Sequence, residues 1–365
     1  ILMTEGCRGE GGIIVNKNGY RYLQDYGMGP ETPVGEPKNK YMELGPRDKV
    51  SQAFWHEQQK GNTIKHPLGD VVHLDLRHLG EEYLQERLPF ICELAKAYVN
   101  VDPAKEPIPI RPTVHYTMGG IETNGECETR IKGLFAVGEC ASVGLHGANR
   151  LGSNSLAEFV VFGRVAGEQA VKRAAEFKGW NEESIAVQVK AVEARIEALM
   201  NQDGDENWAD IRTEMGHTME AGCGIYRQED LMQATIDKIT ELKARYKKIS
   251  IKDKGKVFNT DLLYAIEVGY GLEVAEAMVH SAILRKESRG AHQRLDDGCT
   301  ERDDVNFLKH SLAFFQEDAA PTIDYSGVKI TKSQPKARLY GEAAEKAAAA
   351  EKAAEVEEKN AEEQA

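Results

Sequence analysis

The sequence lacks several features that would assign it quickly to a class. It has no uncharged apolar run near the ~20 residues that a bilayer requires, so no direct membrane span is predicted. Its six cysteines lie far apart, without a C-x-x-C pair or a histidine at zinc-ligand spacing. We therefore predict no metal site, and a reducing cytosol is the simplest environment. No G-x-G-x-x-G or Walker pattern occurs, which leaves the chain without a standard pyrophosphate-binding turn.

Positive charge is also scarce. The 365 residues carry 46 Lys and Arg against 59 Asp and Glu, a net charge of −13. Nucleic acid is therefore not an expected partner. An anionic substrate would need a local cluster of Arg and His that acts against the overall charge. The length predicts two or more domains, and an apolar fraction of 41% is typical of a soluble globular protein.

Apolar periodicity predicts most of the helices. Residues 81–99 form an amphipathic pattern that Pro89 should break or kink. Apolar residues at three- and four-residue steps over 185–199, 232–246 and 262–284 predict an antiparallel helical bundle.

The remaining segments are less regular. Glycine is dense over residues 112–177, where an apolar run at 133–139 reads as a buried strand before a long loop and a helix. Short apolar patches at 328–330 and 337–340 suggest a terminal strand pair. Residues 341–365, with 8 Glu and 3 Lys, have too few large apolar side chains to form a core and are predicted to be disordered or weakly helical.

Four places could carry chemistry, and each has a plainer alternative. The glycine-rich stretch 4–12 mixes carboxylates with an arginine, as a surface turn also can. Arg47 follows Gly-Pro, a rigid turn that can aim a side chain, although single arginines are usually solvated. Arg150 lies in a glycine-rich loop, and His115 precedes a Met-Gly-Gly turn, where a structural histidine is the commoner explanation.

The residues that open the helix predicted over 156–177 are suited to an N-cap, namely Ser153, Asn154 and Ser155. This is either a simple cap or a helix start that faces an anionic ligand. Glu139, at the end of the predicted strand, is either a surface acid or an acceptor for a hydroxyl-rich ligand.

Taken together, the motifs resemble one family. They are the stretch 4–12 (TEGCRGEGG), 115–120 (HYTMGG), 137–139 (VGE), 146–156 (HGANRLGSNSL) and 285–292 (RKESRGAH). Their fixed order is similar to the succinate dehydrogenase/fumarate reductase flavoprotein family from residue 1 to about 340. Three features of that family are absent here and are expected to precede residue 1: the dinucleotide turn, the histidine that carries covalent FAD, and a His-Pro-Thr-Gly segment.

The resemblance implies an α+β fold made of a partial FAD-binding domain with a capping domain, followed by the helical bundle and a C-terminal region. Its segments are expected as a capping region (1–111), a returning part of the FAD-binding domain (112–177), the bundle (178–299), the C-terminal region (300–340) and the acidic tail (341–365).

The resemblance also implies roles for single residues. Arg47 corresponds to the proton donor to the substrate, with Arg8 and Glu5 in the relay that resupplies it. Thr4, His115 and Arg150 correspond to groups that hold the substrate carboxylates. The implied FAD contacts are Tyr116, Thr117, Glu139, Ser153, Asn154, Ser155 and Leu156.

The implied activity is reduction of fumarate, a dicarboxylate, to succinate by hydride transfer from FAD. Electrons would come from a quinol through an iron-sulfur subunit in anaerobic respiration, with membrane anchor subunits holding the protein at the cytoplasmic face of the bacterial inner membrane. Two alternatives stay open. One is succinate dehydrogenase, which runs the same site in reverse. The other is a catalytically incomplete fragment that serves only as interaction surface; the isolated chain is expected to bind FAD weakly or not at all.

Overall fold

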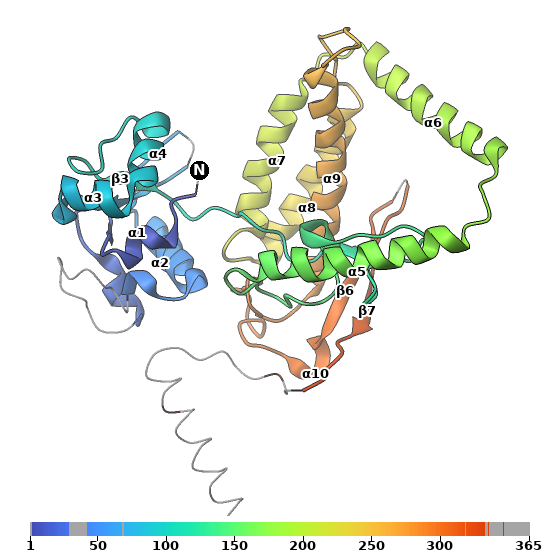
Figure 1. Cartoon of the computed structure of the whole chain (residues 1–365). Coiled ribbons are helices and arrows are strands. Elements are labelled where there is room, and N and C mark those ends of the chain that lie inside the picture. The colour runs from blue at the N-terminus through green and yellow to red at the C-terminus, as the bar shows by residue number, and fades with distance from the viewer. Residues whose placement is uncertain are drawn as a thin grey trace, which may run out of the picture. The chain divides into compact units, whose positions relative to one another are not determined.

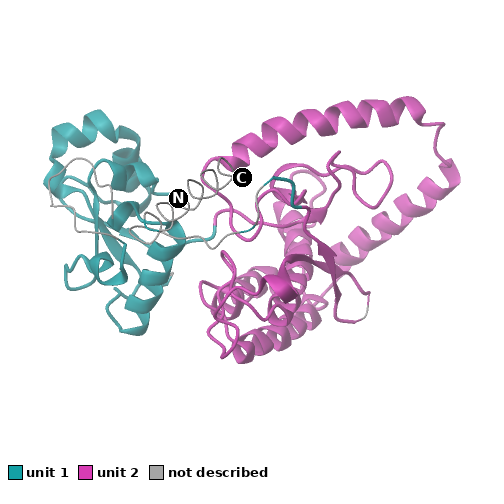
Figure 2. Cartoon of the chain, turned by 90° about the horizontal axis from the view of Figure 1, so that it is seen from below, with its two compact units in different colours: residues 1–114, 330–365 teal, residues 115–329 magenta. Residues whose placement is uncertain are grey.

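The chain forms two compact units (Figure 2). The computed structural model describes residues 2–28, 42–67, 69–317 and 319–332, together with Pro335 and Lys346. Unit 1 comprises residues 1–114 and 330–365, and unit 2 comprises residues 115–329. The predicted acidic tail lies outside the described residues except for Lys346.

Unit 1 is built on a small antiparallel sheet in the order β1 (Ile13–Val15), β2 (Val72–Asp75) and β3 (Ile108–Ile110). Its strands present apolar side chains such as Ile14 and Leu74 to a single core. The elements around the sheet are α1 (Glu5–Gly9), α2 (Arg47–Gln59), α3 (Glu81–Arg87), α4 (Pro89–Val99), η1 (Tyr22–Tyr26), η2 (Met42–Leu44) and η3 (Arg77–Leu79).

The break predicted at Pro89 is confirmed. Leu88 leaves the helical region (φ −134°, ψ 39°) and separates α3 from α4, while Pro89 occupies the first turn of α4. Proline is tolerated there because the first-turn N–H groups have no partner within the helix. Leu84, Ile91 and Ala95 are buried, so both helices contribute apolar residues to the core.

Unit 2 begins with a parallel strand pair, β4 (Ile121–Glu122) and β5 (Ala141–Ser142), and continues through a loop into the long helix α5 (Asn154–Glu176) (Figure 1). The buried strand predicted over 133–139 is wrong. Phe135 makes one isolated bridge to Glu128, and the run ends in η4 (Gly138–Cys140). A strand needs a continuous hydrogen-bonding neighbour, and among the described residues this run has only two such backbone hydrogen bonds, from the Thr129 N–H to the Leu134 carbonyl and from the Ala136 N–H to the Cys127 carbonyl.

A helical bundle follows, formed by α7 (Trp208–Cys223), α8 (Glu229–Tyr246) and α9 (Thr260–Leu284) (Figure 1). Its core includes Ile211, Ile239 and Leu272, which are each at most 1% exposed. The stripe predicted over 185–199 does form a helix, α6 (Glu182–Asn201), but none of its residues is buried. Only its C-terminal end packs against the bundle core, through Leu199 and Met200.

The chain then forms α10 (Asp304–Phe307) and an antiparallel pair, β6 (Lys309–Phe314) and β7 (Thr322–Gly327). Of the strand pair predicted further along, the first member does not form a strand. Residues 328–330 follow β7 without strand structure, and 337–340 lie outside the described residues. The alternation of apolar and polar residues along β6 and β7 is weak because neither strand has a buried face. Among the described residues, no helix has the length and apolarity needed to cross a bilayer.

Candidate active site

In unit 1, one carboxylate lies between two guanidinium groups. Glu5 and Arg8 lie one turn apart on α1, which Thr4 begins by accepting a hydrogen bond from the Gly6 N–H at 3.3 Å. Arg47 is the first residue of α2, so the preceding turn places it at that helix start. Its Nε donates to Glu5 Oε2 at 2.8 Å, and Arg8 Nη2 lies 3.7 Å from the same oxygen. The predicted relay residues therefore form the chain Arg47–Glu5–Arg8, with a hydrogen bond between Arg47 and Glu5 and an ion pair between Glu5 and Arg8.

The two arginines of this chain differ in their surroundings. The Arg47 side chain is 55% exposed, whereas that of Arg8 is 14% exposed. Burial lowers the pKa of Arg8, Glu5 acts to raise it and Arg47 acts to lower it. Arg8 also donates through Nη1 to the backbone carbonyl of Glu43. The relay thus runs from an accessible cation to one that is held within the unit, where its charge is less well solvated.

In unit 2, the predicted carboxylate-binding residues lie together. Arg150 Nη2 donates to His115 Nε2 at 3.3 Å. The Arg150 guanidinium carbon also lies 4.5 Å from the centre of the Tyr116 ring, a cation–π contact. Because His115 Nε2 accepts this bond, that imidazole carries its proton on Nδ1 in this arrangement. The pair presents N–H donors, which is the chemistry that receives a carboxylate.

The predicted FAD contacts lie in the same unit. Glu139 is exposed on η4, and its Oε1 accepts a hydrogen bond from the Thr117 N–H at 2.8 Å. The helix that follows the glycine-rich loop begins at Asn154, two residues before the predicted start. Ser153 does occupy the cap position, but its φ of 64° is left-handed and its side chain makes no capping hydrogen bond. Of the two alternatives for this helix start, the simple side-chain cap is therefore not formed by Ser153.

These observations fit part of a flavin site. The start of α5 has no side-chain cap, and although the Asn154 and Leu156 N–H groups donate to the Leu151 and Ser153 carbonyls, the positive end of the helix dipole still favours an electron-rich group there. Gly120 has a φ of 140°, and a Cβ there would lie 2.5 Å from the Cys140 carbonyl oxygen, so the backbone approaches closely beside Glu139. Ser155 and Leu156 lie in the first turn of the same helix.

Sequence reasoning missed two residues of this site. His146 and Glu158 contact each other and the Tyr116 hydroxyl, with His146 Nε2 at 2.6 Å from Glu158 Oε2. Glu158 is 2% exposed. A signal was present, because Glu158 interrupts an otherwise apolar stretch at residues 156–162. A buried carboxylate needs a partner, and such an interruption points to one.

The structure brings the predicted residues together in two groups. Thr4, Glu5, Arg8 and Arg47 belong to unit 1, and the remaining predicted site residues belong to unit 2. The convergence of Arg47 with His115 and Arg150 on one substrate stays a prediction.

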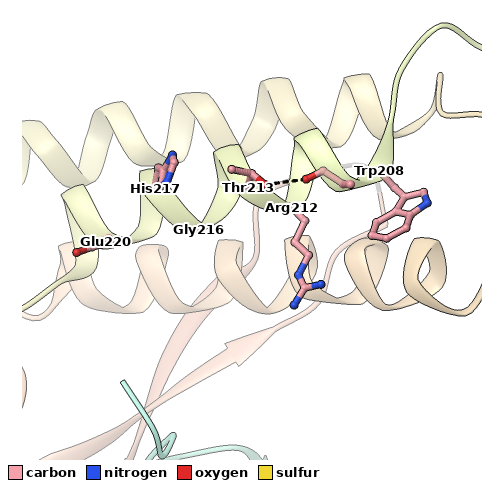
Figure 3. A pocket seen from close by; sticks show the side chains of 7 residues that line it. Trp208, Arg212, Thr213, Gly216, His217 and Glu220 are labelled. Carbon is pink, nitrogen blue, oxygen red and sulfur yellow. Dashed lines mark hydrogen bonds between the residues drawn. The ribbon is translucent and has the colours of Figure 1, made fainter. Parts of the chain in front are cut away.

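One surface hollow lies elsewhere. It has a volume of about 490 Å³ and is lined only by α7 residues, Trp208, Ala209, Arg212, Thr213, Gly216, His217 and Glu220. Figure 3 shows these side chains along a single helix, where Thr213 Oγ1 donates to the Ala209 carbonyl at 2.9 Å. None of the predicted site residues lines it, and a hollow on one helix has no opposing wall. It is therefore not a candidate for the catalytic site.

Comparison with known families supports the flavoprotein interpretation. A model described as FAD binding domain matches residues 1–156, and one described as fumarate reductase flavoprotein C-term matches residues 212–340. The match to an FAD binding domain confirms the prediction of FAD as cofactor. The class of protein is thus a flavoprotein with an FAD-binding domain.

Individual relatives agree with the models. The chain is 73% identical over 355 residues to the fumarate reductase flavoprotein subunit of Escherichia coli, covering 96% of this chain and 59% of that protein. It is 40% identical to the succinate dehydrogenase flavoprotein subunit of Rickettsia conorii, covering 90% and 54%. A solved quinol-fumarate reductase with menaquinol molecules matches with a TM-score of 0.88 and 74% identity, covering 92% of this chain and 58% of that chain.

The chain therefore belongs to the succinate dehydrogenase/fumarate reductase flavoprotein family, and the α+β fold predicted from the sequence is confirmed. It spans 59% of the length of the E. coli relative.

Proposed function

We propose that the protein to which this chain belongs is the flavoprotein subunit of an enzyme that reduces fumarate to succinate. When bound, FAD supplies the hydride that this reduction needs. The observation that carries the proposal is the chain Arg47–Glu5–Arg8, in which Glu5 Oε2 lies 2.8 Å from Arg47 and 3.7 Å from Arg8. The names of the relatives support it, since the one from E. coli is a fumarate reductase flavoprotein subunit.

The substrate carboxylates are assigned to Arg150, His115 and Thr4. Fumarate carries two negative charges, and the arginine fork meets a carboxylate with two parallel hydrogen bonds. The Arg150–His115 contact in unit 2 supports this assignment, because it places the two side chains next to each other. Fixed cations beside the reacting double bond also stabilise the negative charge that develops on reduction.

The proton is assigned to Arg47, with Glu5 and Arg8 resupplying it. Arginine is a poor acid in water because its pKa lies above ~12. A carboxylate at hydrogen-bond distance offers a route by which a proton can return, and burial lowers the pKa of Arg8 behind it. The relay thus combines an exposed donor with a more acidic guanidinium that feeds it.

The flavin contacts are assigned to Tyr116, Thr117, Glu139 and residues 153–156. The exposed Glu139 carboxylate can accept from hydroxyl groups, and the start of α5 can stabilise negative charge on a reduced ring. These residues would bind and orient the cofactor.

Substitution of Arg47 tests the proposal. In the full-length protein with FAD bound, Arg47→Ala should lower fumarate reduction by at least the ~10²–10⁴-fold that a positioned acid contributes, and Arg47→Lys should also fail because an ammonium lacks the planar fork. Flavin content should not change. The matched control is Arg164→Ala, since Arg164 is 82% exposed on α5 and pairs only with Glu168 in the described structure. Retained turnover in Arg47→Ala would remove Arg47 from the mechanism.

The assembly is part of the same proposal. We assign electron supply to a quinol through an iron-sulfur subunit, in anaerobic respiration, and attachment to membrane anchor subunits at the cytoplasmic face of the inner membrane. The solved relative that contains menaquinol supports a quinol as donor.

Succinate dehydrogenase is the second candidate, supported by the Rickettsia relative of that name. The same residues serve both directions, because catalysis is reversible. Measuring both rates on an electrode over a range of applied potentials separates the two candidates: fumarate reductase should favour reduction at low potential. The incomplete-fragment alternative predicts that the isolated chain shows no flavin absorbance after mixing with FAD and gel filtration.

A further inference from the structure

Three polar groups meet behind the Arg150–His115 pair. The Tyr116 hydroxyl lies 2.9 Å from Glu158 Oε2 and 3.2 Å from His146 Nε2, and those two atoms are 2.6 Å apart. The three residues come from different places in unit 2: the extended segment after Val114, the loop before α5, and the second turn of α5. We call His146, Glu158 and Tyr116 the anchor cluster.

In the anchor cluster the Glu158 and His146 side chains are mostly buried and Tyr116 is half-buried, and the hydrogen bonds have one consistent direction. The Glu158 and His146 side chains are 2% and 9% exposed. Glu158 Oε2 accepts from the Tyr116 hydroxyl and from His146 Nε2–H, so the histidine proton lies on Nε2. His146 Nδ1 is buried and has no partner within the described structure. Burying a carboxylate and a half-satisfied imidazole opposes folding, so their placement calls for a role other than stability.

Within the anchor cluster, His146 and Glu158 hold the ring of Tyr116 in place. The His146 ring packs edge-on against it with centroids 5.5 Å apart, and both partners fix its hydroxyl. Burial and the Glu158 carboxylate raise the pKa of Tyr116 to about 12, so the hydroxyl remains a donor at neutral pH. The ring therefore has little freedom to rotate or tilt.

The free face of that ring carries Arg150. The guanidinium carbon lies 4.5 Å from the ring centre, and the same guanidinium donates to His115. In the described structure Arg150 makes no ion pair with a carboxylate. Its orientation therefore depends on the aromatic face beneath it and on the histidine beside it.

We propose that Glu158 and His146 are positioning residues for dicarboxylate binding: through the Tyr116 hydroxyl they fix the surface on which Arg150 is held beside His115. This rests on the proposed function, which assigns Arg150 and His115 to a substrate carboxylate. Binding that is equal in the ground and transition states changes KM with little change in kcat. Loosening the anchor cluster should therefore weaken dicarboxylate affinity while the chemical step remains.

The test uses the full-length protein with FAD, and malonate as a non-reacting dicarboxylate probe. Glu158→Gln and Tyr116→Phe should each raise the malonate Kd and the fumarate KM about tenfold, as expected for the loss of one charge-assisted hydrogen bond, with kcat within about threefold. Adding Glu158→Gln to Tyr116→Phe should cause no further loss, because the carboxylate acts through the hydroxyl. The control is Tyr246→Phe, whose hydroxyl donates to the Ala265 carbonyl at 2.8 Å within the bundle.

Each outcome of this test either supports the proposal or overturns it. If Tyr116→Phe keeps its flavin and an unchanged malonate Kd, or if the two substitutions add, the proposal is overturned even where Glu158→Gln fails to fold. A KM shift in Tyr246→Phe equal to that in Tyr116→Phe would also overturn it, because the effect would then be general. If the unsubstituted protein neither binds malonate nor reduces fumarate, the proposed function fails and this inference fails with it. If it does both and the variants match it, only this inference fails.

Discussion

Arg21 forms a bidentate ion pair with Glu43 inside unit 1. Nε and Nη2 of Arg21 donate to Oε1 and Oε2 of Glu43 at 2.6 and 2.7 Å, and the glutamate side chain is fully buried. The backbone carbonyl of Glu43 accepts from Arg8. The ion pair thus fixes the segment that holds the inner end of the relay, and it links the core of unit 1 to the candidate chemistry.

Removing one partner of this ion pair should lower the free energy of unfolding. Glu43→Gln removes the carboxylate that accepts from two nitrogens of the buried Arg21, and loss of a buried partner typically costs about 3–5 kcal/mol. We expect the free energy of unfolding in urea to fall by that order. Glu168→Gln is the control, since it breaks the surface pair with Arg164 and should change stability by about 0.5 kcal/mol or less. Equal effects for the two variants would contradict the finding that the buried pair stabilises this segment.

The carboxylate between the two arginines gives a second prediction. In the full-length protein, Glu5→Gln removes the charge that connects Arg47 to Arg8, so fumarate reduction should fall by about 10²-fold or more. Flavin content and the malonate Kd should stay near those of the unsubstituted protein, because Glu5 is assigned to proton supply. Asp102→Asn is the control: Asp102 pairs with Lys105 at 3.0 Å in the same unit, after the C-terminal end of α4. Normal turnover in Glu5→Gln would exclude the relay.

How much of the fold can be predicted from the sequence depends on whether an element is determined by its own residues or by a partner elsewhere in the chain. Helix α8 follows from local periodicity, and the break at Leu88 follows from Pro89, since proline acts on its own backbone. The run at 133–139 has the composition of a strand, but a strand exists only with a partner, and sequence composition does not name one.

The candidate site shows the same limit. Motifs placed Arg47, His115 and Arg150 among the candidates, because each lies in a short recognisable stretch. His146 and Glu158 were missed as site residues because their importance comes from contacts between a loop and a helix twelve positions apart. Side-chain orientation at the helix start was also unpredictable: Ser153 has the right chemistry for a cap, but its left-handed backbone turns the side chain away from that role.

A third prediction concerns the loop that carries Arg150. Gly290 has a φ of 58°, and a Cβ there would lie 2.6 Å from the Ala148 carbonyl oxygen, which also accepts from the Ala291 N–H at 2.9 Å. Gly290→Ala should therefore displace the loop two residues before Arg150 and raise the fumarate KM roughly tenfold, since small misplacements of binding groups are costly.

Gly298→Ala separates the effect of backbone strain from the effect of displacing the loop that carries Arg150. Gly298 also has a positive φ, 75°, but nothing lies within 4 Å of a Cβ at that position. Both substitutions should cost about 1 kcal/mol of stability through the left-handed backbone. Only Gly290→Ala should change KM, measured by steady-state kinetics. A matching KM change in Gly298→Ala would assign the effect to general strain.

The last prediction is a pH dependence of stability that originates at His292. Its Nδ1 accepts from Arg227 at 2.8 Å and its Nε2 donates to the Arg285 carbonyl at 2.9 Å. Burial, reinforced by the charges of Arg227, Arg294 and Arg285, lowers the pKa of His292 from 6.5 to about 4. Between these two values the unfolded chain binds more protons than the folded chain, so stability decreases as the pH falls from about 6.5 to 4.

The full decrease from this one group amounts to roughly 3 kcal/mol, because one pKa unit corresponds to about 1.4 kcal/mol. Urea unfolding at pH 7 and pH 5 should show about 2 kcal/mol of this decrease, because the rest of it occurs below pH 5. His292→Gln offers an amide oxygen to Arg227 and an amide N–H to the Arg285 carbonyl, so it should keep much of the stability at pH 7 and lose part of the pH dependence. His217→Gln, at an exposed position on α7, should leave that dependence unchanged. If His292→Gln retains the full decrease between pH 7 and pH 5, other groups must cause it, and His292 is not held neutral by its burial.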